Sequence, residues 1–167
     1  MASDAQSRAQ TFRGEPLAYG MQGHNCGYRH RKFWSWAHVH FPSPGSSSTV
    51  EALVYEMPFG LVFRKAVVWH EGREYIFQNL QNLQRDPSQL VWSFFCLNPK
   101  VSAIKVEVQG RKGFIHHLPY FRTDCSGQFE VSNDSLATAQ MTWYAPGNPP
   151  KELRTEIGAV IEMAGGS

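Results

Sequence analysis

The segment 33–41 contains two tryptophans and two histidines and is the part of the chain best suited to chemistry. Every second residue there carries an indole or imidazole ring, in the order Trp34, Trp36, His38 and His40. A β-strand places alternate residues on one face, so these four side chains are expected to line up. His38 and His40 have the spacing of a metal-binding pair, but the sequence places no third ligand, and a zinc site needs about four. We therefore predict hydrogen-bonded histidines and no metal.

A second segment, 49–57, supplies a carboxylic acid and a phenol. Glu51 and Tyr55 fall on one face of the expected strand, with Leu53 between them. Each group can donate a proton or orient a ligand by hydrogen bonding. The two side chains would converge on a ligand if that face points toward the interior.

A glycine-rich loop with a polar trio precedes the aromatic strand. Its order is Gly20, Gln22, Gly23, His24, Asn25 and Gly27. Two interpretations of the His24–Asn25 pair stay open: it takes part in catalysis, or it ties the loop to neighbouring carbonyl groups, as buried polar groups require. Cys26 is likewise either a nucleophile or an inert small apolar side chain.

The elements that position these groups are expected to be β-strands. Short β-branched and aromatic runs alternate with turn residues, and no stretch keeps a helical apolar period for three turns. Ten strands are predicted, at 33–41, 49–57, 61–70, 75–78, 90–97, 103–109, 113–118, 128–131, 136–144 and 153–163. A short helix is considered only for 79–88, where Pro87 would end it. We therefore predict an all-β domain over 16–167, a single antiparallel barrel of about 8–10 strands with little helix, after a flexible segment 1–15.

The strand at 136–144 also separates two faces. Ala137, Ala139, Met141 and Trp143 alternate with Leu136, Thr138, Gln140, Thr142 and Tyr144. Because polar groups interleave aromatic rings here and in 33–41, we favour a ligand cavity over a barrel filled by its own side chains. The predicted ligand contacts are Gln22, Asn25, Trp34, Trp36, His40, Gln140, Trp143 and Tyr144.

The composition excludes several classes of function. The 167 residues include 16 basic and 14 acidic side chains, so the chain lacks the basic excess of a nucleic-acid binder. It contains no phosphate-binding glycine loop, nucleophile elbow or dinucleotide motif. Cys26, Cys96 and Cys125 do not form a disulfide pattern, and no apolar run is long enough for a membrane span. We therefore expect a soluble, cytoplasmic protein.

Three segments together carry a resemblance to a known family. They are YGMQGHNCGYRHRKFWSWAHVHF at 19–41, FRKAVVWHEGREYIFQ at 63–78 and SNDSLATAQM at 132–141. The first resembles the GMQGHNWG…WAW signature of the lipocalin-like (calycin) family that includes carotenoid 1,2-hydratase, tocopherol-cyclase-like proteins and lipocalin-like Diels–Alderases. Cys26 stands where that family usually has Trp, and the match resembles the second barrel of its two-barrel members.

The resemblance implies a lipocalin-like barrel and non-redox chemistry without a cofactor. The implied enzyme is a cyclase or isomerase, or a hydratase, acting on a hydrophobic polyene, terpenoid or polyketide. Aromatic walls would stabilise positive charge, and His24, His38, Glu51 or Tyr55 would supply the proton or orient the substrate. Two alternatives stay open: a non-catalytic binder or carrier of a small hydrophobic ligand, and a structural half that pairs as a homodimer or with a partner barrel.

Overall fold

A computed structural model describes residues 33–43, 47–98, 102–121 and 127–165, and these ranges are almost entirely β-strand. The ten strands are β1 (Trp34–Phe41), β2 (Ser48–Glu56), β3 (Val62–His70), β4 (Arg73–Phe77), β5 (Leu80–Asp86), β6 (Val91–Asn98), β7 (Ser102–Gln109), β8 (His116–Phe121), β9 (Gln128–Tyr144) and β10 (Lys151–Ala164). One 3₁₀ turn, Pro58–Gly60, follows β2. The all-β prediction is confirmed for these residues.

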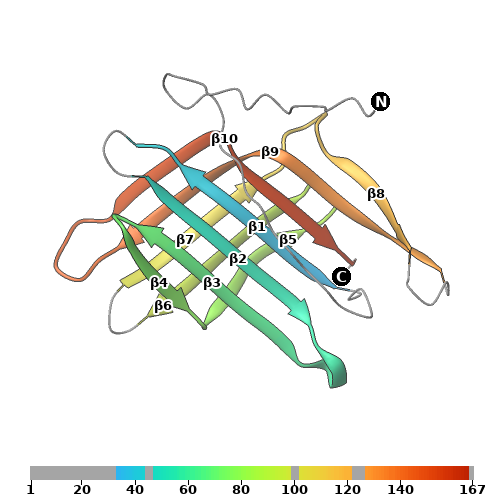
Figure 1. Ribbon diagram of the computed structural model, residues 1–167, viewed down its shortest axis with the longest axis horizontal. Helices are drawn as coiled ribbons and strands as arrows, with labels where there is room; N and C mark the ends of the chain where they lie inside the picture. The colour runs from blue at the N-terminus through green and yellow to red at the C-terminus, as the bar shows by residue number, and fades with distance from the viewer. Residues whose placement is uncertain (1–32, 44–46, 99–101, 122–126, 166–167) are drawn as a thin grey trace, which may run out of the picture.

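Every strand pairing is antiparallel, and the ten strands form one sheet (Figure 1). The order is β4-β3-β2-β1-β10-β9-β7-β6-β5. β8 lies beside the first part of β9, and β7 beside its second part. The predicted strands at 128–131 and 136–144 are therefore one long strand.

The segment considered for a short helix is a strand instead. β5 covers most of 79–88 and pairs with β6 from Leu80 to Asp86. Backbone pairing with β6, the next strand in the chain, overrides a weak helical preference here. The turn between β3 and β4 is a two-residue hairpin turn. Glu71 and Gly72 both have positive φ, as such a turn requires, and glycine adopts this conformation readily.

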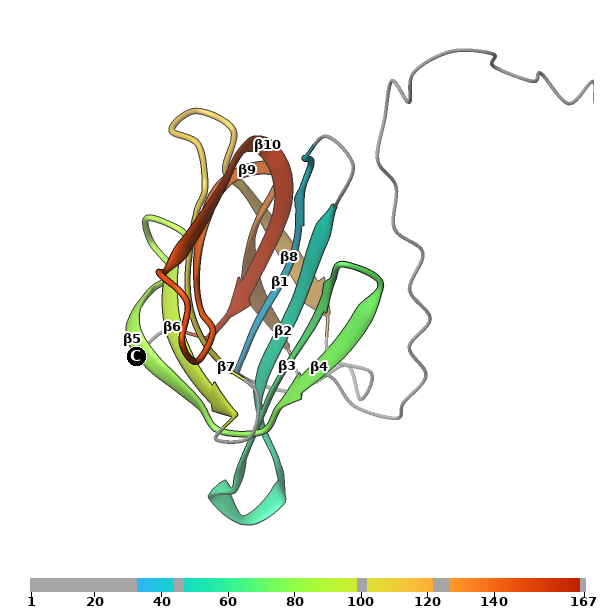
Figure 2. The ribbon, with the colours of Figure 1, turned by 90° about the vertical axis from the view of Figure 1, so that its left-hand side faces the viewer.

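The predicted closed barrel is not observed, because the end strands β4 and β5 are not paired with one another. Only Gln78 and Asn79 separate these two strands in the chain, so the curled sheet brings its two ends together at that point (Figure 2). The Asn98 side chain of β6 also donates a hydrogen bond to the carbonyl oxygen of Ile76 in β4, at 3.2 Å. Elsewhere along their length, β4 and β5 are not paired with each other.

The inner face of the curled sheet is filled by its own side chains. The largest of them, Trp92, Phe41, Phe77 and Phe94, are at most 1% exposed. Such burial leaves no room for a water-sized molecule against these rings and supplies roughly 1.5–3 kcal/mol per side chain. The indole of Trp92 donates to the Asn82 side chain at 3.0 Å, so its one polar atom is satisfied.

Arg85 ties the β5 end of the sheet to its middle. The guanidinium donates to the Ser35 hydroxyl at 2.8 Å and to the carbonyl oxygens of Trp34, Ala164 and Gly165 at 3.2, 2.7 and 3.1 Å. It also lies 4.1 Å from the ring centre of Phe33. A single side chain thus links β5 to β1 and to the end of β10, where no strand pairing does so.

Candidate functional site

The residues that the sequence singles out on β1 and β2 lie on the outer face of the sheet. Ala37 and Val39 of β1 and Val50 and Ala52 of β2 fill the inner face, at 0 or 1% exposed. The alternation of a strand then turns their neighbours outward. The predicted cavity lining is corrected accordingly, because the face that holds Trp34, Trp36, His38 and His40 points away from the packed core.

Strand register brings several of the candidate residues side by side on that outer face. The register of β1 and β2 sets Trp34 opposite Tyr55, Trp36 opposite Leu53, and His38 opposite Glu51. Directly opposed residues of an antiparallel pair have neighbouring side chains. Glu51 and Tyr55 share one face as expected, but that face points outward, so the condition for their convergence inside a cavity is not met.

His38 and Glu51 form the acid–base pair of this group. The His38 Nδ1 atom lies 4.0 Å from a Glu51 carboxyl oxygen, and the His38 side chain is 7% exposed whereas that of Glu51 is 44% exposed. Burial lowers the pKa of His38 below its ordinary value of 6.5; the Glu51 charge opposes this shift and His40 adds to it. A neutral imidazole near pH 7 is able to accept a proton.

Half-buried apolar side chains lie beside this pair on the same face of the sheet. We call them the aromatic patch: Trp34, Trp36, Leu53, Tyr55, Phe63 and Val67. The rings of Tyr55 and Phe63 stack at 4.9 Å between centres. The Trp34 indole, opposite Tyr55 in the strand register, donates to Glu162 at 2.8 Å. The rings of the patch therefore lie together on one side of the His38–Glu51 pair.

His40 lies on the same face but is engaged in a hydrogen bond. Its Nδ1 atom lies 3.2 Å from the Thr49 hydroxyl, and burial lowers its pKa. This contact agrees with the hydrogen-bonded role predicted from the sequence. In the described ranges, no three His, Cys, Asp or Glu side chains lie close enough together to hold a metal ion.

The ligand contacts predicted on β9 do not join the patch. Trp143 is 6% exposed and packs in the core, where its ring lies 5.0 Å from those of His70 and Tyr75. Gln140 and Tyr144 face outward, but over the opposite part of the sheet. The other predicted contacts, Gln22 and Asn25, and the predicted catalytic His24 lie outside the described residues.

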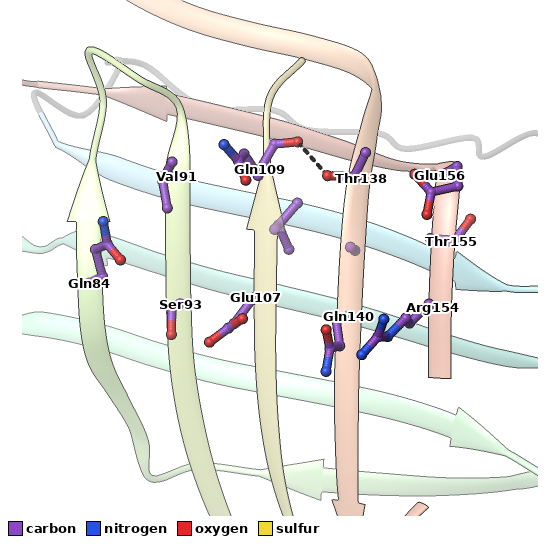
Figure 3. A pocket seen from close by; sticks show the side chains of 12 residues that line it. Gln84, Val91, Ser93, Glu107, Gln109, Thr138, Gln140, Arg154, Thr155 and Glu156 are labelled. Carbon is purple, nitrogen blue, oxygen red and sulfur yellow. Dashed lines mark hydrogen bonds between the residues drawn. The ribbon is translucent and has the colours of Figure 1, made fainter. Parts of the chain in front are cut away.

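A polar groove of about 370 Å³ occupies this opposite part of the outer face (Figure 3). Gln140 lies in it together with Glu107 of β7 and Arg154 of β10. The sequence reasoning missed Glu107 and Arg154. Alternation of polar residues along 105–109 and 138–142 was the available signal, but which strands are neighbours is visible only in the fold.

A second set of residues that the sequence did not reveal links the ends of three strands, β2, β3 and β10, and the turn after β3. The Ser48 hydroxyl lies 2.6 Å from His70 Nδ1, and His70 Nε2 lies 3.4 Å from Glu71, which also binds Lys151 at 3.2 Å. Burial is the largest cause that lowers the pKa of His70, with Lys151 adding to it and Glu71 opposing it. Ser48 is only 2% exposed, so we assign this network a structural role.

No helix among the described residues is long and apolar enough to cross a membrane. Comparisons of the chain with protein-family profiles, with curated proteins and with solved structures each give no match.

Proposed function

We propose that this chain binds a small, apolar, unsaturated molecule on the aromatic patch. The observation that carries the proposal is the His38–Glu51 pair, 4.0 Å apart among half-buried aromatic rings that the core does not use. Aromatic rings offer large apolar area with few rotatable bonds, and a small number of polar groups fixes a ligand's orientation. The filled inner face argues for an outer site over an enclosed one.

The architecture supports the relation to lipocalin-like proteins that the sequence motifs imply. Ten antiparallel strands curl around one apolar core, and the sheet ends approach each other at Gln78 and Asn79. A lipocalin-like ancestry with an open edge is therefore part of the proposal. The ligand class that this ancestry implies is a polyene, terpenoid or polyketide.

A second candidate function is cofactor-independent isomerisation or cyclisation of the bound molecule. The lowered pKa of His38 favours it, because a neutral imidazole can take a proton from one carbon of the ligand and return it to another. The Glu51 charge would stabilise the imidazolium formed between these two steps. Proton removal and return leave the oxidation state of the ligand unchanged; water addition by a hydratase would use the same base.

Binding is tested with all-trans-retinol, an uncharged polyene, followed by quenching of tryptophan fluorescence. Trp36→Ala is expected to weaken retinol binding about tenfold, which corresponds to roughly 1.4 kcal/mol of lost contact. Thr142→Ala, on the outer face of β9 away from the patch, is the matched control and should leave the affinity unchanged. Equal affinity of the Trp36→Ala variant and the unaltered chain would refute the binding proposal.

The His38→Gln variant distinguishes the two candidate functions, binding and isomerisation. If the chain is a binder, His38→Gln changes affinity only, and incubation with polyenes yields no new isomer by chromatography. If it is an isomerase, the unaltered chain forms a new isomer and His38→Gln abolishes this while it retains binding. A homodimer that buries the patch, seen by native mass spectrometry as a dimer that does not bind retinol, would favour a structural role over both.

A further inference from the structure

The polar groove is chemically unlike the aromatic patch and lies over different strands. It spans β5, β6, β7, β9 and β10, whereas the patch spans β1, β2 and β3. Its lining includes the apolar Val108 and Ala139, and polar side chains such as Glu107, Gln140 and Arg154 project from neighbouring strands (Figure 3). The groove therefore needs a ligand of a different class from an apolar polyene.

Strand register arranges the groove residues as a continuous row. Each member is directly opposite the next on the neighbouring strand, in the order Gln84, Ser93, Glu107, Gln140 and Arg154. Neighbouring strands are about 4.8 Å apart, so the row is roughly 19 Å long. A linear ligand that crosses the strands would meet one polar side chain at each step.

The amide groups of the groove are available to a ligand. Gln84, Gln109 and Gln140 make no side-chain hydrogen bond to any residue in the described part of the chain, and each amide offers two donors and an acceptor. Glu107 is bound to Lys105 at 2.7 Å and Arg154 to Glu152 at 3.3 Å. Both ion pairs are largely exposed, and such pairs are readily exchanged for ligand contacts.

Charge in the groove disfavours an anionic ligand. Glu107 and Glu156 supply two carboxyl groups and Arg154 one guanidinium, so an anion would meet more negative than positive charge. The amide and hydroxyl groups instead require a partner that both donates and accepts hydrogen bonds. Hydroxyl groups do both.

The irregular course of β10 forms one side of the groove. β10 has two extra residues between Thr155 and Ala159 relative to β9, and Thr155 and Glu156 line the groove where this bulge begins. Thr155 Oγ1 accepts a hydrogen bond from the Gly158 nitrogen at 2.9 Å, which holds the bulge in place. A bulge of this kind re-aims side chains at a site without breaking the sheet.

We propose that the polar groove binds a neutral oligosaccharide that runs across the strands, with ring hydroxyls hydrogen-bonded along the row from Gln84 to Arg154. This site is separate from the proposed polyene site. Gln140, at the fourth position of the row, and Glu107 beside it make the principal contacts. Arg154 binds at the end of the row.

The test is a titration of ¹⁵N-labelled protein with maltotetraose, cellotetraose and chitotetraose, monitored by amide chemical shifts. We expect at least one of them to shift amides of β6, β7 and β9 around Ser93, Glu107 and Gln140, and not those of β1 and β2. Gln140→Leu and Glu107→Leu are each expected to weaken binding about fivefold, as the loss of a hydrogen bond predicts. Thr142→Ala, on the same face of β9 beyond the groove, is the control and should change affinity less than about twofold.

Three results would overturn the proposal: no shifts with any of the three sugars, shifts confined to other strands, or equal affinity of both groove variants and the unaltered chain. Saturation with retinol separates this test from that of the polyene site. Sugar shifts that persist in its presence support two distinct sites, and their loss would assign both ligands to one surface and contradict the separation proposed here.

Discussion

The two halves of the outer face share one sheet and one core, yet they carry opposite chemistry. Over β1, β2 and β3 the outward positions hold aromatic rings around His38 and Glu51. Over β6, β7 and β9 the outward positions hold amides, hydroxyls and charges in register. Behind both, the inward positions are mostly apolar, with buried polar exceptions such as Ser35, Ser48 and His70. The core thus sets the fold, and only the outward positions are free to differ between the two halves.

The largest expected effect comes from the core that both halves share. Phe94→Ala, at a residue that is 0% exposed, should lower the free energy of unfolding by about 3–5 kcal/mol, through lost burial and the cavity left behind. Phe95→Ala, the next residue on the opposite face of β6, should cost about 1 kcal/mol or less. Urea denaturation measures both. Equal losses would mean that the inner and outer faces are wrongly assigned.

A smaller effect is expected where Arg85 joins the two halves. Arg85→Met removes hydrogen bonds to Ser35 and to three carbonyl oxygens, and charged hydrogen bonds of this kind contribute about 1.5–3 kcal/mol. We expect a loss of about 2 kcal/mol in urea denaturation, with faster amide exchange at the ends of β1 and β10. A variant as stable as the unaltered chain would show that Arg85 does not tie the halves together.

One variant from each half, tested against both ligands, shows whether the two halves bind independently. Trp36→Ala should lower retinol affinity about tenfold and leave sugar affinity unchanged, and Gln140→Leu should do the reverse. Additivity is expected because the residues lie on different strands without shared partners. If either variant alters both affinities, the two surfaces are coupled and do not act as separate sites.

The smallest effect concerns pH and the His70 network. Because the pKa of His70 in the fold lies below its ordinary value of 6.5, the unfolded chain binds a proton more readily. Stability is therefore complete above about pH 6.5 and falls as the pH drops toward the folded pKa. The drop in melting temperature between pH 7.5 and pH 5.5 should be smaller in His70→Gln than in the unaltered chain.

Thr142→Ala is the control for this pH effect, since the Thr142 side chain does not titrate. It should keep the full difference in melting temperature. The opposite ranking of the two variants would assign the pH dependence to another group, and His38 is then the next residue to test, because burial also lowers its pKa.

Local patterns predicted the strands well and their packing less well. Alternation placed β1 within one residue of its observed bounds and put Glu51 and Tyr55 on one face of β2, as observed. Alternation did not show which face of β1 points into the core, because both faces carry aromatic or apolar residues. β5 was missed because apolar and polar residues do not alternate along it: polar residues predominate, and Leu83 is exposed like Gln81.

Long-range features were beyond sequence reasoning. The row from Gln84 to Arg154 needs the sheet order, the Arg85 contacts join residues as far apart as Arg85 and Gly165, and the contact of Ser48 with His70 needs their register. The open edge between β4 and β5 likewise depends on how the sheet curls. None of these leaves a fixed spacing in the chain.

The most direct test of the central claim is an amide chemical-shift titration of the unaltered chain with all-trans-retinol. We expect shifts at residues of β1, β2 and β3 around His38, Glu51 and Tyr55, with the amides around Gln140 unchanged. Absence of shifts, or shifts that centre on the groove or on core residues such as Phe94, would contradict the assignment of the aromatic patch as the ligand site.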